Sequence, residues 1–453
     1  NTDFIDNSAG VDTSDHEVNI KILLNEVVAR GALTVEARNT LLAEMTDEVG
    51  VLVLRDNYLQ NQAISVMERM SVSRLGSKQH FIRTLESKGL LDRQLEYLPS
   101  DAEFAERKSR GLGLTRPELS VLLSYAKIVL FNQLLESDVP EDPFLSTELL
   151  RYFPKPLQNR YAAEMQGHRL KREIIATAVT NSIVNRMGAT FIMRMQEDTG
   201  ASFARVAKSF AVAREVLDAR SLWAGIEALD NLVPERVQTN ARLRVWNVLR
   251  QVCRWLLNLP GNELDIQKAV DRFAPGVRKL AAGIQHVVPR AEQKALAASF
   301  DELKRQGIND ELAQRLAYLP SLSAVMDIVR AAEEVGLDVS EVARSYFELG
   351  DQLHLEWLRN QVESLPVDGR WHANARGSLR DELNEQHRAL VRQVLRYSNG
   401  DERVRVWCEA HQGPLKYAQN MLADMRAAAL TDYATVSVAI RRLSQLNLQT
   451  AAG

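Results

Sequence analysis

Apolar residues recur every three to four positions along almost the whole chain, which is the spacing of one face of an α-helix. The first clear stripe runs from Ile20 to Val28, and Gly31 then ends the pattern. Almost no stretch alternates apolar and polar residues between turn signals, as a half-buried strand does. The nearest case, Val49 to Leu54, continues directly into a helical pattern that reaches Met70, so we interpret it as helix. The sequence therefore predicts an all-α fold of many helices.

Helix starts and composition support the same interpretation. The chain holds 22 Gly and 13 Pro in 453 residues, both below average usage, whereas helix formers abound. Capping boxes, in which a Ser or Thr is followed three residues later by Glu, mark helix N-termini. Three such patterns are Ser14 with Glu17, Ser100 with Glu103, and Thr115 with Glu118.

The length is too great for one ordinary hydrophobic core, so several domains or a long helical array are expected. A Pro-rich acidic segment at 137–144, SDVPEDPF, is typical of a linker. It separates a helical region at 32–136 from a C-terminal helical domain at 145–453. No repeat period of about 30 to 45 residues is present, which disfavours the common helical repeat arrays.

Charge and residue spacing exclude several classes of function. A net charge of −3 and a pI near 6.3 give no reason to expect nucleic acid or a membrane surface as partner. Cys253 and Cys408 form no disulfide framework or metal-ligand spacing, which suits the cytoplasm. The eight histidines form no HxxxH or HExxH pattern, so no metal site is expected. Because the first residue is Asn, we expect the chain to be cut from a longer protein.

The stretch RGLGLT, Arg110 to Thr115, superficially resembles a phosphate-binding loop. It lacks the third Gly of G-x-G-x-x-G and the Lys-Ser/Thr of a P-loop, and no strand precedes it. We interpret it as a turn leading into a helix that Thr115 caps. From residue 31 onward, no motif specifies a reaction.

The N-terminal segment NSAGVDTSDHE, Asn7 to Glu17, admits two interpretations. In the first, it is a loop that leads into a helix capped by Ser14, with Gly10 permitting a tight turn. In the second, the hydroxyl of Ser14, backbone N–H groups and the positive end of the helix bind a carboxylate. The second interpretation also accounts for the many polar residues in this loop.

The same segment resembles a known family. NTDFIDNSAGVDTSDHEVNIKILLNEVVARG is similar to the end of the catalytic region of large bacterial NAD-specific glutamate dehydrogenases, and NSAGVDTSDHE resembles the NAGGV-x-x-S-x-x-E pattern of glutamate dehydrogenases generally. MTDEVGVLVLRDNYLQNQAIS and LTRPELSVLLSYAKI also resemble the large family. The resemblance implies that residues 1–31 are the C-terminal edge of the catalytic domain and that the rest is the C-terminal part of such an enzyme.

The resemblance also implies roles for three residues. Ser14 matches the Ser that binds the side-chain carboxylate of glutamate, Val11 matches the Val that lines the same pocket, and Asn7 matches the Asn near the nicotinamide ribose. The family pattern has Ala-Gly where this chain has Ser8-Ala9, so the chain departs from the pattern at these two positions. Lys21 does not match the family's catalytic lysine.

The implied reaction is the oxidative deamination of L-glutamate to 2-oxoglutarate and ammonia, with NAD as cofactor. The catalytic Lys and Asp and most NAD contacts lie upstream in the family, so this chain is expected to contain no catalytic residue and to be inactive alone. The family is oligomeric, which implies a homo-oligomer. The alternative from another class is an independent helical scaffold that binds proteins, which a buried Ser14 in an ordinary helix would favour.

Overall fold

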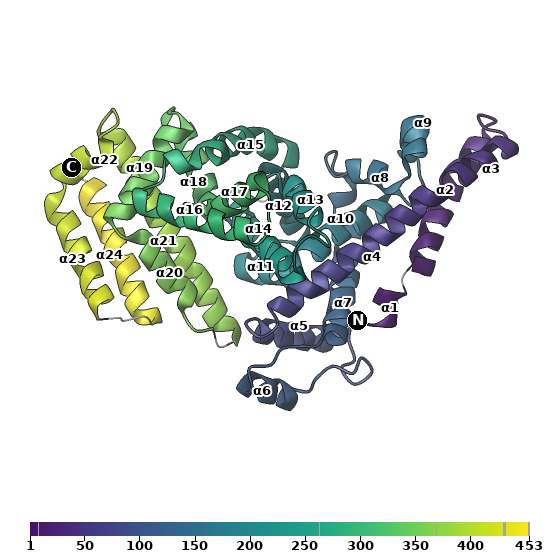
Figure 1. Ribbon diagram of the computed structural model, residues 1–453, viewed down its shortest axis with the longest axis horizontal. Helices are drawn as coiled ribbons and strands as arrows, with labels where there is room; N and C mark the ends of the chain where they lie inside the picture. Colours follow the sequence, from purple (N-terminus) through teal and green to yellow (C-terminus); the bar gives the residue numbers. More distant parts are fainter. Residues whose placement is uncertain (8, 262, 368, 429–431, 452–453) are drawn as a thin grey trace. The chain divides into compact units, whose positions relative to one another are not determined.

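The computed structural model describes residues 1–7, 9–261, 263–367, 369–428 and 432–451, shown as a ribbon in Figure 1. Every regular element among these residues is an α-helix or a short 3-10 helix, and none is a strand. The predicted all-α fold is therefore confirmed. Residues 49–54, which alternate weakly in sequence, lie inside one long helix as predicted.

The chain divides into two units with dense internal packing, and the division runs through α12, α14 and α15. Unit 1 comprises residues Asn1–Ala211 and Leu256–Gln267. Its helices are α1 (Asp3–Asp6), α2 (Ala9–Ala29), α3 (Val35–Glu44), α4 (Thr46–Arg69), α5 (Leu75–Ser87), α6 (Asp101–Ser109), α7 (Arg116–Leu135), η1 (Val139–Glu141), α8 (Thr147–Tyr152), α9 (Lys155–Met165), α10 (Lys171–Met187), α11 (Phe191–Thr199) and most of α12 (Phe203–Val216).

Unit 2 comprises residues Val212–Trp255 and Lys268–Gly453. Its helices are α13 (Ala219–Glu227), most of α14 (Glu235–Leu257) and of α15 (Ile266–Gly283), η2 (Ile284–His286), α16 (Arg290–Arg305), α17 (Asp310–Tyr318), η3 (Leu319–Ala324), α18 (Val325–Val335), α19 (Val339–Gln352), α20 (Leu355–Ser364), α21 (Gly369–Tyr397), α22 (Arg403–Ala410), α23 (Gln412–Ala427) and α24 (Tyr433–Ala451).

The core of unit 1 forms where α4 packs against α2, α7 and α10. Helix α7 begins with the predicted capping box: Thr115 caps its N-terminus and Glu118 bonds back to the Thr115 N–H at 2.7 Å. In the part of the chain that the structure describes, α7 alone is long and apolar enough to match a membrane span. Its buried residues include Leu119 and Leu122, and it packs against α4 and α10, as a core helix does.

The segment at 137–144 differs from the prediction of a linker. Val139 and Pro140 are buried in the short helix η1, which packs against α7 and α10 within unit 1. Lys208 pairs with Asp138 at 2.7 Å and reaches toward Asp142 at 3.7 Å. The prolines and acidic residues that suggest a linker in sequence instead form a packed turn. The predicted domain ranges 1–31, 32–136 and 145–453 stay predictions.

Unit 2 is built around α21, which packs against α18, α19, α20, α22 and α24 (Figure 1). Among the described residues of unit 2, one acidic side chain is buried, that of Asp327 of α18. The Asp327 carboxylate accepts hydrogen bonds from Trp255 Nε1 and from Arg388 Nη1, both at 2.6 Å. These partners link α14, α18 and α21, and burial raises the pKa of Asp327 above its usual range.

Candidate functional site

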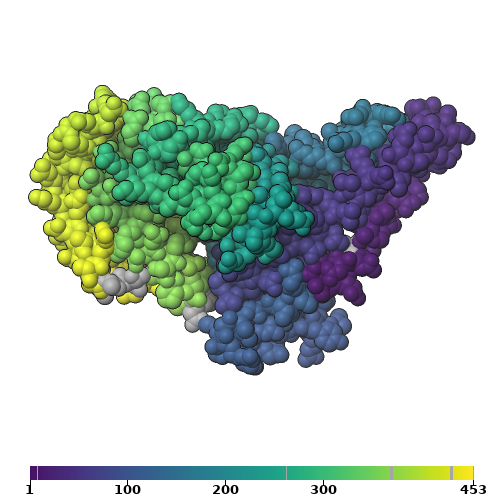
Figure 2. Space-filling model, in the orientation of Figure 1, coloured from purple at the N-terminus to yellow at the C-terminus, as the bar shows by residue number. Residues whose placement is uncertain are grey.

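The three residues that the resemblance assigns to the pocket lie at the N-terminal end of unit 1. Asn7 follows α1 and is exposed, whereas Val11 and Ser14 lie in the first two turns of α2. Val11 is 78% exposed, Ser14 is exposed, and Val18 on the same helical face is 48% exposed. Residues three or four apart share a face of a helix, so Val11, Ser14 and Val18 form an exposed stripe. Figure 2 shows the N-terminal residues, in purple, at the surface of unit 1.

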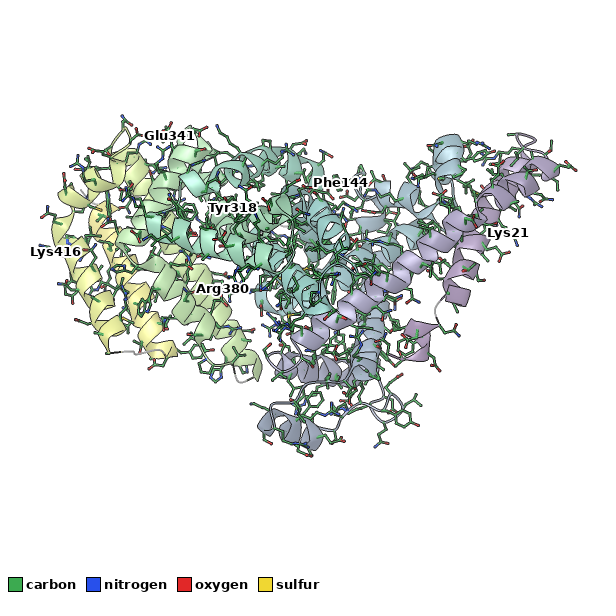
Figure 3. The ribbon with its side chains drawn as sticks, in the orientation of Figure 1. Lys21, Phe144, Tyr318, Glu341, Arg380 and Lys416 are labelled. Carbon is green, nitrogen blue, oxygen red and sulfur yellow. The ribbon has the colours of Figure 1, made fainter. Side chains whose placement is uncertain are left out.

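The structure corrects the predicted role of Ser14 as an N-cap. Helix α2 already begins at Ala9, so Ser14 lies inside the helix, and its predicted capping box with Glu17 does not form. Glu17 instead pairs with Lys21 one turn later, on the exposed side of α2, where Figure 3 labels Lys21. Gly10 and Thr13 have low helix propensity, yet both lie inside α2. Ser8, the departure from the family pattern, lies outside the described residues.

This correction changes what Ser14 offers a ligand. Backbone N–H groups inside a helix bond to carbonyls one turn earlier, so they are not available at Ser14. The Ser14 hydroxyl is therefore the polar group that the exposed stripe presents. The predicted anion-binding helix end at Ser14 is replaced by a side-chain donor flanked by Val11 and Val18.

Behind the stripe, a polar network fixes α2 to the rest of unit 1. The Tyr152 hydroxyl donates to Asp15 Oδ2 at 2.7 Å and accepts from Asn19 Nδ2 at 2.8 Å. His168 Nε2 lies 3.0 Å from the Asn19 carbonyl, and the rings of His16 and Tyr152 stack with centroids 4.5 Å apart. These contacts tie α2 to α8 and to the turn before α10, and they set the direction in which the stripe faces.

A second polar group lies beside this network, formed by Asp12, His16 and Asp56. The side-chain atoms of these residues that could bind a metal all lie within 4.8 Å of one another. Asp12 and His16 belong to α2, and Asp56 belongs to α4. His16 is 3% exposed, and its Nδ1 is buried without a hydrogen-bond partner among the described residues. We call Asp12, His16, Asp56 and the nearby Lys127 of α7 the α2–α4–α7 cluster.

The surroundings of this cluster shift the acid–base properties of its members. Burial, followed by the charges of Asp56 and Asp15, raises the pKa of Asp12 to about 7. Burial likewise raises the pKa of Asp56 above its usual range and lowers that of His16 below its usual range. Burial lowers the pKa of Lys127 to about 8, although Asp56 and Asp12 act in the opposite direction. The cluster therefore takes up or releases protons near neutral pH.

Two carboxylates and an imidazole form a donor set that divalent metal ions accept. In this cluster the ammonium of Lys127 already supplies a positive charge that acts on both carboxylates. A positive charge beside a metal site opposes metal binding. We therefore interpret the cluster as one in which Lys127 of α7 compensates the negative charges of Asp12 and Asp56. The prediction that the chain binds no metal stays a prediction.

The sequence carries one signal for this cluster, which is the spacing of Asp12 and His16. Asp12 and His16 are four residues apart, which places them on one helical face, but only if the helix begins before Ser14. Asp56 and Lys127 belong to helices whose pairing with α2 no local pattern indicates.

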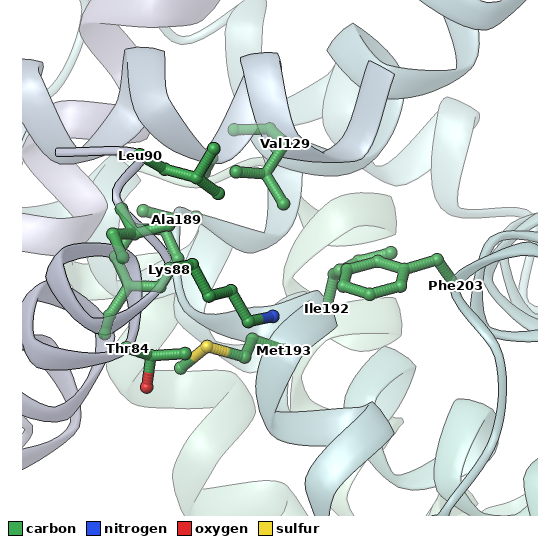
Figure 4. Close-up of a pocket in the computed structure, with 13 residues that line it drawn as sticks. Thr84, Lys88, Leu90, Val129, Ala189, Ile192, Met193 and Phe203 are labelled. Atoms are coloured by element: carbon green, nitrogen blue, oxygen red, sulfur yellow. The ribbon is translucent and has the colours of Figure 1, made fainter. Parts of the chain in front are cut away.

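A small pocket also lies in unit 1, between α5, α7 and the start of α11 (Figure 4). Its volume is about 30 Å³, and most of its lining is apolar, including Val129, Ile192 and Phe203. Figure 4 shows the Lys88 side chain extending among Thr84, Ile192 and Met193. A space of this size accommodates water rather than a substrate.

The sequence was then compared with known protein families. The family model "Glutamate dehydrogenase, C-terminal" matches residues 111–445, which is most of the chain. The chain belongs to this glutamate dehydrogenase family. The model "Bacterial NAD-glutamate dehydrogenase, catalytic domain" matches residues 1–67, the part that carries Asn7, Val11 and Ser14. The resemblance to the large bacterial enzymes is thus confirmed.

Curated glutamate dehydrogenases match over nearly the entire chain. The NAD-specific glutamate dehydrogenases of Pseudomonas aeruginosa and Halomonas elongata are each 42% identical over 450 residues, which is 98% of this chain. That of Mycobacterium tuberculosis is 32% identical over 457 aligned positions. The chain spans 28% of the length of each of these relatives.

Proposed function

We propose that this chain is the C-terminal portion of a cytoplasmic NAD-specific glutamate dehydrogenase and supplies one wall of its glutamate pocket. In this proposal the Ser14 hydroxyl donates a hydrogen bond to the distal carboxylate of L-glutamate, and Val11 contacts the aliphatic part of the substrate. The observation that supports it most is the exposed stripe of Val11, Ser14 and Val18, within the segment that matches the catalytic domain.

The remaining parts of the reaction are assigned to residues outside this chain. NAD, when bound, accepts the hydride during oxidative deamination to 2-oxoglutarate and ammonia. The exposed side chain of Asn7 has a donor and an acceptor suited to a ribose hydroxyl, and most other NAD contacts are expected upstream. The helical units beyond residue 31 serve assembly or regulation, and we expect the full enzyme to be a homo-oligomer.

The test is the Ser14→Ala variant of the full-length enzyme. Loss of a hydrogen bond to a carboxylate costs about 1.5–3 kcal/mol, so kcat/KM for glutamate should fall roughly ten- to a hundredfold. The KM for NAD should stay unchanged, because Ser14 faces the substrate. Since Ser14 lies inside a helix, Ala does not remove a cap, and the thermal midpoint should not fall.

Thr13→Ala is the matched control, because Thr13 is an exposed hydroxyl on the same turn that points about 100° away. It should leave kcat/KM for glutamate unchanged. The alternative of a protein-binding helical scaffold without a pocket wall predicts that both variants behave alike. Equal kinetics for the two variants would therefore refute the role of Ser14.

A further inference from the structure

Unit 2 contains a pocket of about 500 Å³, and none of the residues discussed above lines it. Its walls come from α16, the η3 segment, α19, α20 and the side chain of His387 on α21. Pockets that bind small molecules have volumes of roughly 300–1,000 Å³, so this one is large enough for an organic ligand. It lies wholly within unit 2.

One side of this pocket is acidic. Glu292, Asp351 and Glu356 all line it, from α16, α19 and α20. The Glu292 carboxylate accepts a hydrogen bond from the buried Ser321 hydroxyl, which fixes its orientation. Burial raises the pKa of Glu292, and the charges of Glu356 and Asp351 act in the same direction, whereas the hydrogen bond from Ser321 and the charge of Arg359 oppose the shift. Three carboxyl groups thus act on the same space.

The one lining guanidinium, that of Arg359, is engaged by its neighbours. Its Nη2 donates to the Tyr346 hydroxyl at 3.2 Å and to His387 Nδ1 at 2.7 Å. Its Nη1 lies 3.7 Å from Glu356 Oε2 and pairs with that carboxylate, which leaves Glu292 and Asp351 to face a ligand. His387 Nε2 lies 3.0 Å from the Tyr346 carbonyl, to which it donates, so the imidazole is neutral. Burial and the adjacent Arg359 lower the pKa of His387 well below its usual range. The pocket therefore holds more negative than positive charge.

The other side of the pocket is apolar. Leu296 on α16 is 6% exposed, and Phe347 on α19 and several alanines complete this surface. Among the described residues, one group of three potential metal ligands lies within 4.8 Å, and it is Asp12, His16 and Asp56 of unit 1. The three carboxyl groups of the pocket are thus too far apart to share a single metal ion.

We propose that this pocket binds a small organic cation, in which an ammonium or guanidinium group is attached to a short apolar body. The cationic group lies between Glu292 and Asp351, where its several N–H donors reach separate carboxylates. The apolar body contacts Leu296 and Phe347. This assignment is independent of the proposed substrate wall, because all of its residues belong to unit 2.

The proposal predicts a link between binding and protonation. A cation beside Glu292 favours the ionised carboxylate, so binding releases a proton from any fraction that is protonated. Affinity should therefore rise as the pH increases from 5 to 8, and the heat of binding should depend on the ionisation enthalpy of the buffer.

Titration calorimetry on the 453-residue chain tests this with three probes of one shape: benzylammonium, benzyl alcohol and benzoate. Benzylammonium should bind at least tenfold more tightly than the alcohol, and benzoate should bind most weakly. Equal affinity for the ammonium and the alcohol, or preference for benzoate, would overturn the proposal.

Variants then locate the site. Glu292→Gln preserves shape and the hydrogen bond from Ser321, and it should weaken benzylammonium binding at least tenfold. Asp351→Asn, at an exposed position, provides a second variant that does not depend on the core of unit 2. Glu311→Gln, an exposed carboxylate on α17 outside the pocket, is the control and should bind as the parent does. Unchanged affinity in both pocket variants would exclude this site.

Discussion

Asp12 of α2 and Asp56 of α4 bring carboxylate oxygens within 4.8 Å of each other, and His16 lies at the same point. Two like charges at this distance in a partly buried place disfavour full ionisation. Lys127 provides the compensating charge from α7. Because these helices form the core beneath the stripe of Val11 and Ser14, the protonation state of the cluster should affect the stability of the proposed substrate wall.

The first prediction concerns the pH dependence of stability. The pKa of Asp12 is about 7 in the folded chain and about 3.8 when unperturbed, so the folded state binds this proton more tightly. The corresponding stability is fully present below pH 4 and is lost as the pH rises through 7. Asp12→Asn should therefore be more stable than the parent at pH 8 by about 1–2 kcal/mol, after allowance for solvent screening.

Thermal or urea unfolding at pH 5 and pH 8 measures this difference. Glu17→Gln, an exposed carboxylate on the same helix, is the control and should leave the pH dependence unchanged. An Asp12→Asn chain that loses stability between pH 5 and 8 as steeply as the parent would contradict the assignment.

The second prediction concerns the cation of the cluster. The folded pKa of Lys127, about 8, is below its usual 10.5, so the folded state binds this proton less tightly than the unfolded state does. The free energy of unfolding therefore decreases as the pH falls from 10.5 through 8, and this cost of burying the ammonium is fully present at lower pH. Lys127→Met removes this cost but leaves Asp12 and Asp56 without compensation. The variant should match or exceed the parent at pH 5 and be less stable at pH 7.5, where Asp12 and Lys127 are both mostly charged, by on the order of 1 kcal/mol. A variant that is equally stable relative to the parent at both pH values would refute the role of Lys127.

The third prediction concerns Gly113, in the RGLGLT turn. A Cβ at this position would lie 2.4 Å from Ser71 Oγ, which accepts a hydrogen bond from the Leu114 N–H at 2.6 Å. Gly113→Ala must displace the turn from this buried hydroxyl and should destabilise unit 1 by about 1–3 kcal/mol. Gly76→Ala, inside α5 with open space around it, is the control and should be neutral or stabilising. Urea unfolding of the two variants compares them directly.

The fourth prediction is that the 453-residue chain alone shows no glutamate-dependent NADH formation. The reacting Lys and Asp and the nucleotide-binding region are expected upstream, and positioned groups provide most of the rate of such enzymes. Spectrophotometric assay of the purified chain, with the full-length enzyme as positive control, measures this. Turnover by the chain itself would show that it holds catalytic groups that the sequence did not reveal.

The sequence by itself determined the helical class and several helix boundaries. Spacing of three and four residues places apolar side chains on one face, and this signal is local. The capping boxes at Ser100 and Thr115 form as predicted, because their donors and acceptors lie within three residues of each other. The turn at Arg110 and Gly111 was also predicted, although the hydrogen bond between Leu114 and Ser71 that follows it was not.

Tertiary structure decided the features that depend on partners distant in the chain. The same local pattern at Ser14 forms no cap, because α2 already begins at Ala9 and its first turn meets α4 through Asp12 and Asp56. Packing against α7 and α10 likewise converts the Pro-rich segment at 137–144 from an expected linker into part of unit 1. The meeting of Asp12 with Asp56 requires α2 and α4 to pack together, and burial energy rather than local propensity fixes that pairing.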